Sequence, residues 1–453
     1  MTFPRFPQYK ESNVDWIGEV PIHWGIERFK VSINTCRNGI WGNEATGDKD
    51  DIPCVRVADF DRTKLEVKGE IPTIRNVTEK EQANRTLSKG NLLIEKSGGG
   101  ENQPVGCVVL YNREDKAVCS NFVAKIELAP NMDPSYWRYV HSAAYGIRLT
   151  IGSINQTSGI QNLDQDRYFN ERTAYPPLNE QIAIAKFIED EVAKIDTLVD
   201  EQEKLIRLLK EKKQAVISNA VTKGLDLKIK MKDSGVAWLG EIPKHWGVKA
   251  IKHIVSTPVT DGPHETPEFF DEGVPFVSAE AVSSGEVDFT KIRGFISKEC
   301  HKQYSLKYLP KRGDIFMIKS GATTGVTAIV ETDQEFNIWS PLAVIRCNVE
   351  SNPYYVLNFM RSLNFQEAVA LNWNFGTQQN IGMGVIENLF CPVPSQQEQK
   401  AIAEYLTSFT KQFNTLISEA NNAIELLKER RSALVLAAVT GQIDVRNYQR
   451  EVA

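Results

Sequence analysis

The stretch Lys96-Ser97-Gly98-Gly99-Gly100 has the residue types of a phosphate-binding loop. Such a loop needs its glycines before a Gly-Lys-Ser or Gly-Lys-Thr that opens a helix, because backbone amides and the helix start hold the phosphates. Here the lysine comes first, between two segments that read as strands. The order of residues therefore favours a tight turn between strands over a nucleotide site.

A second stretch, Asn352-Pro353-Tyr354-Tyr355, is similar to the Asn-Pro-Pro-Tyr motif of adenine methyltransferases but lacks the second proline. Proline at this place is also typical of a helix start. The six histidines show no metal-ligand spacing, and no Ser/His/Asp set or carboxylate pair stands out. We expect no catalytic centre and no bound metal or cofactor on this chain.

Composition limits the classes of protein that remain. The net charge of −5 and the pI of about 5.9 argue against a generally basic protein that binds nucleic acid without regard to sequence, although local basic faces stay possible. Seven cysteines without a Cys-x-x-Cys pair indicate reduced thiols. With neither a signal peptide nor a long apolar run, the sequence predicts a cytoplasmic protein that does not cross a membrane.

Two long helices are predicted, over Glu180–Gly224 and Glu398–Gly441. Apolar residues recur in each at alternating steps of four and three, which is the heptad pattern of a coiled coil. Lys213 and Arg431 occupy matching positions in this hydrophobic seam. The seam residues are Val192, Ile195, Val199, Gln202, Ile206, Leu209, Lys213, Val216 and Ala220 in the first helix, and Leu406, Thr410, Phe413, Ile417, Ala420, Ile424, Leu427, Arg431, Leu434 and Ala438 in the second. The economical arrangement is a two-helix coiled coil that acts as a spacer.

The remaining sequence is duplicated. The segment from Ser12 to Gly25, with Trp16, His23 and Trp24, returns from Ser234 to Gly247 at an offset of 222. Lys-Ser-Gly recurs at 96–98 and 319–321, and Gln-Asn recurs at 161–162 and 379–380. The chain is therefore two copies of one plan, each a globular domain followed by a long helix.

The predicted fold class is α+β: two similar mixed α/β domains with a curved, mainly antiparallel sheet, separated by the helices. Strands are expected at 91–94, 105–111, 123–128, 314–318 and 342–346, and helices at 134–145 and 353–371. The predicted boundaries are 1–176 for the first domain, 177–224 for its helix, 225–233 for a link, 234–392 for the second domain, 393–441 for its helix and 442–453 for a tail.

Taken together and in this order, the motifs resemble those of specificity subunits of type I restriction–modification systems. The resemblance rests on the duplicated Trp-Ile/Leu-Gly-Glu-Val/Ile-Pro openings that close on His-Trp, on Asp261-Gly262-Pro263-His264, on the Lys-Ser-Gly and Gln-Asn signatures, and on the Pro-x₃-Glu-Gln that opens each long helix. It covers almost the whole chain.

The resemblance implies a subunit without catalysis that recognises double-stranded DNA. Each globular domain would read one half of a bipartite target, and the helices would pack antiparallel as spacer and docking surface. Two modification subunits that methylate adenine N6, and restriction subunits joined through them, would be the partners. S-adenosylmethionine, ATP and magnesium would belong to those partners, not to this chain.

Amides and cations read base edges, and small polar groups and lysines contact phosphates, so residues of these types in the predicted loops are the candidates for reading DNA. In the first domain they are Asn38, Trp41, Asn43, Arg56, Lys96, Ser97, Gly98, Gly99, Asn102, Gln103, Thr157, Ser158 and Gln161. In the second they are Thr260, Asp261, His264, Lys319, Ser320, Thr323, Thr324, Gln378, Gln379 and Asn380.

Several of these residues have an equally simple structural interpretation. Lys-Ser-Gly could be only a turn, the Gln-Asn pairs could tie loop backbone to the helix base, Trp41 could lie in the core, and His264 could cap its own turn.

Three other functions stay open at this stage. A relative that recruits another effector to DNA, or competes for modification subunits, would share the sequence pattern. A nuclease or methyltransferase with unrecognised motifs would turn over DNA alone, and a protein-only scaffold would have no affinity for DNA.

One prediction follows from the seam. Inserting one heptad into both long helices keeps the seam in register, and we expect it to lengthen the gap between half-sites while each half-site stays unchanged. Mapping the methylated sequence before and after insertion measures this. Altered half-sites with an unchanged gap would contradict the spacer role.

Overall fold

The computed structural model describes residues 3–157, 159–226, 228–375 and 379–448. The chain divides into two compact units: unit 1 comprises residues 1–202 and 423–453, and unit 2 comprises residues 203–422. Unit 1 is thus built from both ends of the chain, whereas unit 2 is continuous. No helix among the described residues is long and apolar enough to cross a membrane.

Unit 1 is organised around a six-stranded sheet of order β4-β14-β10-β12-β8-β7, in which only β12 and β8 run parallel. Smaller sheets, β13-β6-β9-β5 and β11-β16-β15, extend it. The strands are β1 Tyr9–Glu11, β2 Glu19–Pro21, β3 Gly25–Arg28, β4 Ile33–Asn38, β5 Asn43–Glu44, β6 Asp51–Val55, β7 Phe60–Asp61, β8 Glu66–Val67, β9 Ile74–Asn76, β10 Leu92–Glu95, β11 Ser97–Gly98, β12 Val108–Leu110, β13 Val118–Cys119, β14 Val123–Leu128, β15 Ile154–Thr157, β16 Ile160–Leu163 and β17 Arg172–Tyr175. Its short helices are α1 Glu79–Gln82, α2 Pro134–Gly146 and α3 Gln165–Phe169.

The central strands of unit 1 are buried on both faces. Leu92 and Ile94 of β10 join the cluster that contains α2 and the long helices, while Leu93 faces a second cluster with Val109 and Val123. Alternation of side chains along a strand explains the division. One sheet therefore supplies two cores, and its first face fixes the domain to the helices.

Unit 2 repeats the plan with fewer strands. Its central sheet has the order β21-β27-β24-β25, beside β23-β22-β26. The strands are β18 Met231–Asp233, β19 Glu241–Pro243, β20 Gly247–Ala250, β21 Thr260–Asp261, β22 Val274–Val277, β23 Phe295–Ile296, β24 Ile315–Ile318, β25 Thr327–Ile329, β26 Asn337–Ile338, β27 Leu342–Ile345, β28 Asn374–Phe375, β29 Gln379–Asn380 and β30 Phe390–Val393. Its short helices are α5 Lys298–Ser305, α6 Pro353–Met360, α7 Leu363–Leu371 and α8 Met383–Asn388.

The helical structure predicted over 353–371 is present as two helices, α6 and α7, with a short break between them. Ser362 lies between them in an extended conformation, and its hydroxyl accepts a hydrogen bond from the amide of Phe365 at 3.3 Å. The break is explained by this serine, which caps a new helix.

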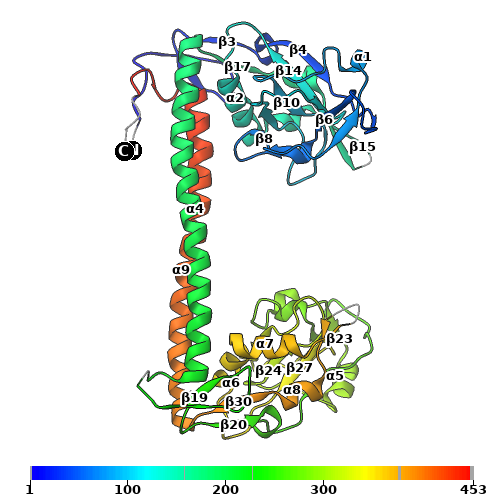
Figure 1. Cartoon of the computed structure of the whole chain (residues 1–453), viewed down its shortest axis with the longest axis vertical. Coiled ribbons are helices and arrows are strands. Elements are labelled where there is room, and N and C mark those ends of the chain that lie inside the picture. Colours follow the sequence, from blue (N-terminus) through cyan, green and yellow to red (C-terminus); the bar gives the residue numbers. More distant parts are fainter. Residues whose placement is uncertain (1–2, 158, 227, 376–378, 449–453) are drawn as a thin grey trace. The chain divides into compact units, whose positions relative to one another are not determined.

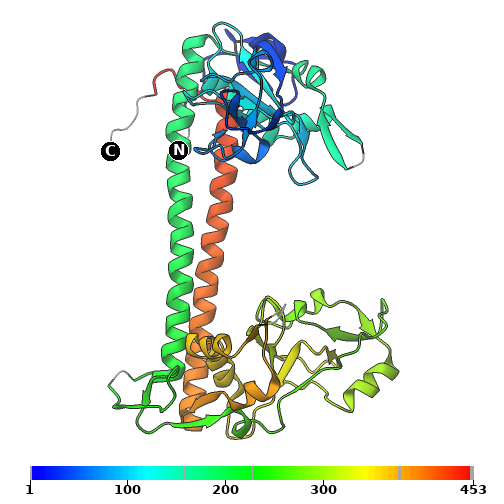
Figure 2. The same cartoon turned by 45° about the vertical axis from the view of Figure 1, so that its right-hand side comes forward.

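The long helices are α4, Leu178–Lys223, and α9, Gln396–Val439, coloured green and orange to red in Figures 1 and 2. They run antiparallel: Asp196 lies beside Arg431 in unit 1, and Lys213 lies beside Asn414 in unit 2. Each ends at a glycine with positive φ, Gly224 at 78° and Gly441 at 77°. These left-handed positions confirm the predicted helix ends.

The hydrophobic seam is confirmed in the burial of both helices. Every predicted seam position is buried or half-buried, while most residues between them are exposed. The two cations in the seam have partners within their own units. The ammonium of Lys213 donates to Asn414 Oδ1 at 2.7 Å, and Arg431 reaches the carboxylate of Asp196 at 3.4 Å and the carbonyl of Thr63. Arg431 thereby links its helix to a turn of the first domain.

A glutamate at the start of each long helix contacts both residues of the repeated His-Trp pair through its carboxylate. In unit 1, Glu180 pairs with His23 Nε2 at 2.7 Å and accepts from Trp24 Nε1 at 2.9 Å. In unit 2, Glu398 pairs with His245 Nε2 at 2.7 Å and accepts from Trp246 Nε1 at 3.2 Å. The duplicated motifs therefore meet: the opening of each domain is bonded to the base of its own helix.

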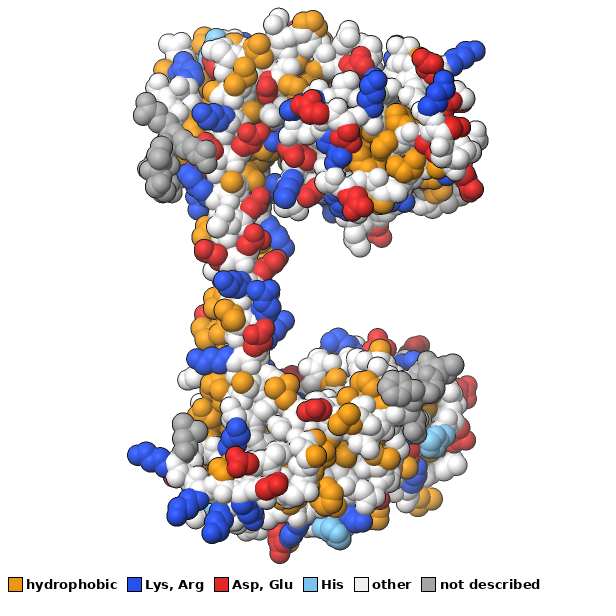
Figure 3. Space-filling view, in the orientation of Figure 1, with side chains coloured by type: hydrophobic (Ala, Val, Ile, Leu, Met, Phe, Trp, Pro, Cys, Tyr) orange, Lys and Arg blue, Asp and Glu red, His pale blue; other side chains and the backbone are white. Residues whose placement is uncertain are grey.

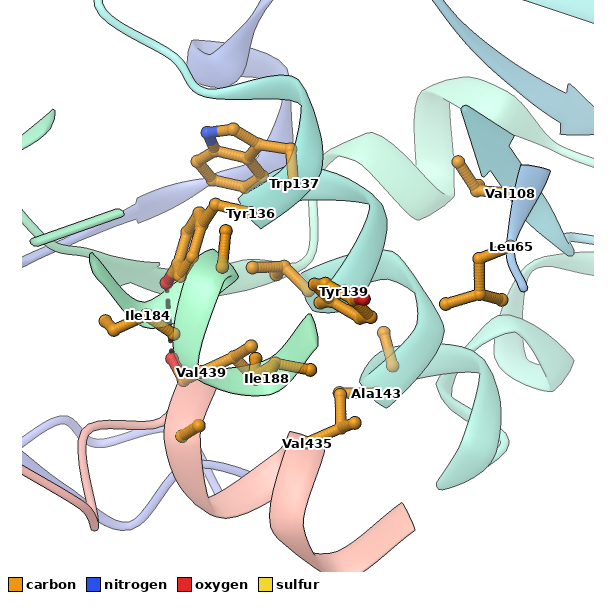
Figure 4. Packing of buried hydrophobic residues seen from close by; sticks show 14 of the residues in the cluster. Leu65, Val108, Tyr136, Trp137, Tyr139, Ala143, Ile184, Ile188, Val435 and Val439 are labelled. Carbon is orange, nitrogen blue, oxygen red and sulfur yellow. Dashed lines mark hydrogen bonds between the residues drawn. The ribbon is translucent and has the colours of Figure 1, made fainter. Parts of the chain in front are cut away.

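A tyrosine completes the attachment in each unit. Tyr136 of α2 donates from its hydroxyl to the carbonyl of Val439 at 3.3 Å, near the end of α9, among the apolar side chains of Ile184 and Ile188 (Figure 4). Tyr355 of α6 makes the equivalent bond to Val221 of α4 at 3.1 Å. Each domain thus holds the start of one long helix and the end of the other.

The ionisation of Glu398 makes this joint sensitive to acid. Burial opposes the charge, but hydrogen bonds from His245, Ser395 and Trp246 outweigh it and lower the pKa to about 2. Because this folded-state pKa lies below the ordinary value of 4.5, the charge stabilises the fold above about pH 4.5, and the stabilisation is lost as pH falls toward 2.

We therefore expect Glu398→Gln to lower the free energy of unfolding by about 1.5–3 kcal/mol at neutral pH, the range for hydrogen bonds to a charged group. The difference from wild type should shrink as pH falls below 4.5. Thermal unfolding at several pH values measures it. Glu404→Gln, an exposed position on the same helix, is the control, and an equal effect of both variants would contradict the assignment.

Candidate nucleic-acid interface

The Lys-Ser-Gly turn of unit 1 is tied to the Gln-Asn strand. Ser97 pairs with Asn162 and Gly98 with Gln161 between β11 and β16. The Ser97 hydroxyl donates to Asn162 Oδ1 at 2.6 Å, and the side chain of Gln161 is buried, accepting from the amide of Val105 at 3.2 Å. Gln161 therefore holds loop backbone, as the simpler interpretation of the Gln-Asn pairs suggested, but its bond goes to Val105 and not to the base of the long helix.

Glycine is required inside this loop. Gly99 has φ of +59°, and a Cβ there would lie 2.8 Å from the amide nitrogen of Val105. The loop thus folds back closely on itself, which keeps its backbone next to the domain surface.

Five of the predicted residues line one hollow of about 500 Å³ in unit 1: Trp41, Arg56, Ser97, Gly98 and Gly99. They come from three separate segments, which backbone hydrogen bonds with residues 119–122 bring together: the amide of Ile40 donates to the Cys119 carbonyl, that of Lys96 to the Phe122 carbonyl, and that of Ser120 to the Val55 carbonyl. The half-exposed guanidinium of Arg56 is paired with Asp59 at 3.4 Å. The hollow also contains Glu95 and Phe122, which sequence reasoning missed.

Trp41 does not lie in the core. Its side chain is 39% exposed, and the guanidinium of Arg75 lies 4.6 Å from the ring centroid. Arg75 also donates to the Trp41 carbonyl at 3.0 Å, so the ring is held at the surface by a cation–π contact and a hydrogen bond.

The other predicted residues of unit 1 lie apart from these contacts. Lys96 is half-buried at the start of the turn, with its amide bonded to the Phe122 carbonyl. The exposed members are Asn38, Asn43, Asn102 and Gln103. Thr157 ends β15, with only its backbone described, and Ser158 lies outside the described residues.

In unit 2, Asp261 is fully buried, and two lysines and a histidine lie against its carboxylate. Its carboxylate lies 2.6 Å from Lys307, 3.2 Å from Lys319 and 3.2 Å from His264. Burial raises the pKa of Asp261, but the hydrogen bonds from the two lysines outweigh burial, so the net pKa is lowered. Asp261 therefore positions Lys319 and Lys307, and its own carboxylate is closed to solvent.

The turn of unit 2 repeats the framework of unit 1. Ser320 bridges to Asn380, and the amide of Gly321 donates to the carbonyl of Gln379 at 3.0 Å. Thr324 is buried, donating to the Gly321 carbonyl at 2.7 Å. Thr260 is half-buried, Thr323, Gln379, Asn380 and His264 are exposed, and Gln378 lies outside the described residues.

Of the two residues of the hollow that sequence reasoning missed, one carried a weak signal. Glu95 precedes Lys96, whereas the matching position in unit 2, before Lys319, is Ile318. A charged residue at a buried strand position of one copy only is such a signal. Phe122 showed none, because an exposed phenylalanine in a short turn looks like any other loop residue.

Acidic and basic side chains are interspersed on the visible face of each unit (Figure 3). Within the described ranges, no group of three or more His, Cys, Asp or Glu residues is arranged to hold a metal ion. The candidate residues thus form glycine loops, exposed amides and an aromatic-edged hollow.

Residues 243–426 match the family model described as the type I restriction modification DNA specificity domain. The EcoBI specificity subunit of Escherichia coli is 23% identical over 449 residues, covering 96% of this chain and 89% of the relative. The putative type I restriction enzyme MjaX specificity subunit of Methanocaldococcus jannaschii is also 23% identical, covering 97% and 98%.

Two solved structures share the fold. A chain from a study of complex assembly and conformational transition of the type I R-M system aligns with a TM-score of 0.70 at 16% identity, over 93% of this chain and 98% of the other. The HsdS subunit of Thermoanaerobacter tengcongensis aligns at 0.54 and 15%, over 94% and 98%. The predicted two-domain α+β architecture is confirmed.

The Asp261 cluster yields a stability prediction. Asp261→Asn removes the charge that pairs with a largely buried Lys319, and we expect a loss of about 3 kcal/mol because a buried cation is left without its partner. Thermal unfolding measures the loss. Asp271→Asn, at an exposed position of the same unit, should change little; equal stability of both variants would show that the cluster contributes nothing.

Proposed function

Because this chain belongs to the specificity-subunit family of type I restriction–modification systems, we propose that it reads a bipartite, asymmetric sequence on double-stranded DNA and directs partner subunits to it. It is a targeting subunit and not an enzyme, in keeping with that family. Its DNA target would place its work in the cytoplasm.

One observation carries the proposal: a framework that is the same in both units holds side chains that differ. The Ser-to-Asn link joins Ser97 with Asn162 in unit 1 and Ser320 with Asn380 in unit 2. Next to this link, unit 1 has Glu95 where unit 2 has Ile318. A backbone framework shared by both units, with different side chains next to it in each unit, suits the reading of two half-sites that differ in sequence.

The partners would be two modification subunits, which methylate adenine N6, and the restriction subunits that join through them. S-adenosylmethionine, ATP and magnesium would be bound by those subunits. Apolar residues exposed on the long helices support a docking role there, since isolated helices in water gain nothing from exposing them. They are Leu178, Ile182, Leu198, Leu205 and Leu208 on α4, and Tyr405, Leu416 and Leu426 on α9.

The experiment that tests the function is a methylome. The chain is co-expressed with the modification subunit encoded beside it in a host without DNA methylation, and methyladenine is mapped by long-read sequencing. We expect a split motif with two different halves and one methyladenine on each strand. A stable complex that adds no methylation would overturn the proposal in favour of a relative that serves another effector.

A residue-level prediction concerns His264, whose side chain is 71% exposed above the Asp261 cluster. Replacing all of 260–266 would destroy that cluster and the close packing of Gly262, where a Cβ would lie 2.0 Å from the Ile338 carbonyl oxygen. His264→Ala removes only the exposed group. We expect relaxed specificity at one position of one half-site, a loss of about 1–3 kcal/mol in discrimination.

The same methylome measures this effect. His253→Ala, an exposed histidine of η4 (Ile251–His253), is the matched control and should leave the motif unchanged. Loss of both half-sites in His264→Ala would mean that the residue supports the fold instead.

A further inference from the structure

The hollow of unit 1 contains a carboxyl group whose hydrogen-bonding capacity the fold satisfies only in part. Glu95 is only 2% exposed, at the end of β10. Its Oε2 accepts from Arg62 Nη2 at 2.7 Å, while its Oε1 has no hydrogen-bond partner among the described residues. Burial raises the pKa of this carboxyl against the effect of Arg62, so a second donor would stabilise the charged form.

Glycine keeps the way to this oxygen open. A Cβ at Gly98 would lie 3.8 Å from Glu95 Oε1, so a side chain there would begin in contact with the free acceptor. The unoccupied space is about 500 Å³, within the range of sites for small organic groups.

Two aromatic residues line the same hollow. Trp41 is 39% exposed and Phe122 is 44% exposed. Trp41 is fixed by Arg75, and the amide of Lys96 donates to the Phe122 carbonyl at 2.9 Å. Aromatic faces beside a buried acceptor are the features that bind a base taken out of its stack.

We propose that this hollow receives a single unstacked cytosine or adenine, the two bases with an amino group (N4 or N6) on the major-groove side of the Watson–Crick edge, and that this amino group donates to Glu95 while the ring lies against Trp41 and Phe122. Carboxylates accept from the cytosine amino group, and thymine offers a carbonyl instead, which Glu95 would repel. This inference rests on the proposed DNA-reading function and deepens it for the first domain. The second domain, with Ile318 at the matching position, would lack this pocket.

The test uses the purified full chain and short labelled single strands of deoxycytidine, deoxyadenosine or thymidine at constant salt, with affinity measured by fluorescence anisotropy. Single strands are used because their bases need no unpairing. We expect wild type to bind the cytidine and adenosine strands roughly tenfold more tightly than the thymidine strand. Equal affinities would overturn the proposal.

Glu95→Gln gives the sharpest contrast. Arg62 only donates, so the amide oxygen of the glutamine stays toward Arg62 and its NH₂ faces the hollow. We expect the preference to shift from the amino bases toward thymidine. A preference that stays as in wild type would overturn the role of Glu95.

Phe122→Ala is a second variant that can test the pocket if Glu95→Gln folds poorly. The Phe122 ring is exposed, so its removal should not disturb the hydrophobic core. We expect about tenfold weaker binding of all three strands. Phe270→Ala, 43% exposed in unit 2, is the matched control and should bind like wild type. Equal binding by the Phe122 and Phe270 variants would overturn the pocket.

The outcome is separable from that of the proposed function. A split methylated motif without a base preference would leave the DNA-reading role and remove the pocket. A base preference that depends on Glu95, without methylation in the co-expressed complex, would leave the pocket and remove the targeting role.

Discussion

The structure depends on one carboxylate at the base of each long helix. Glu180 and Glu398 each accept from an indole and pair with an imidazole, and the residues that supply these groups open the domain that precedes the helix. A charged acceptor with several donors is stabilising only when the donors are fixed in place. The domain and its helix are therefore not independent: the fold of each positions the other.

The neighbouring glutamine extends this joint. Gln181 accepts from the amide of Asp133 at 2.9 Å, and Gln399 accepts from the amide of Asn352 at 2.7 Å. Asp133 and Asn352 are the N-caps of α2 and α6, the helices that carry Tyr136 and Tyr355. One Glu-Gln pair thus orients the helix start, the domain helix and, through the tyrosine, the end of the other long helix. Such shared attachment explains why the duplicated motifs lie far apart in sequence.

Local patterns predicted most of this architecture. Heptad spacing located the seam residues, and branched apolar runs located β10, β14, β24 and β27. The hollow could not be predicted, because Trp41, Glu95 and Phe122 are joined by strand pairings between distant segments, and pairing is not written in local periodicity. The burial of Asp261 could not be predicted for the same reason. Its partner Lys307 follows α5, and no residue near Lys307 in the sequence indicates that it pairs with Asp261.

Unit 1 includes residues 423–453, and its core contains Ala438, Ile443 and Val445 beside Phe6. Unit 2 is continuous and needs none of these residues. During synthesis, the core of unit 1 can therefore be completed only when the last segment has been made, whereas all residues of unit 2 are available earlier. The order in which the two cores can be completed is the reverse of the order in which they are begun, and a chain cut short before residue 423 would lack part of the core of the unit that was made first.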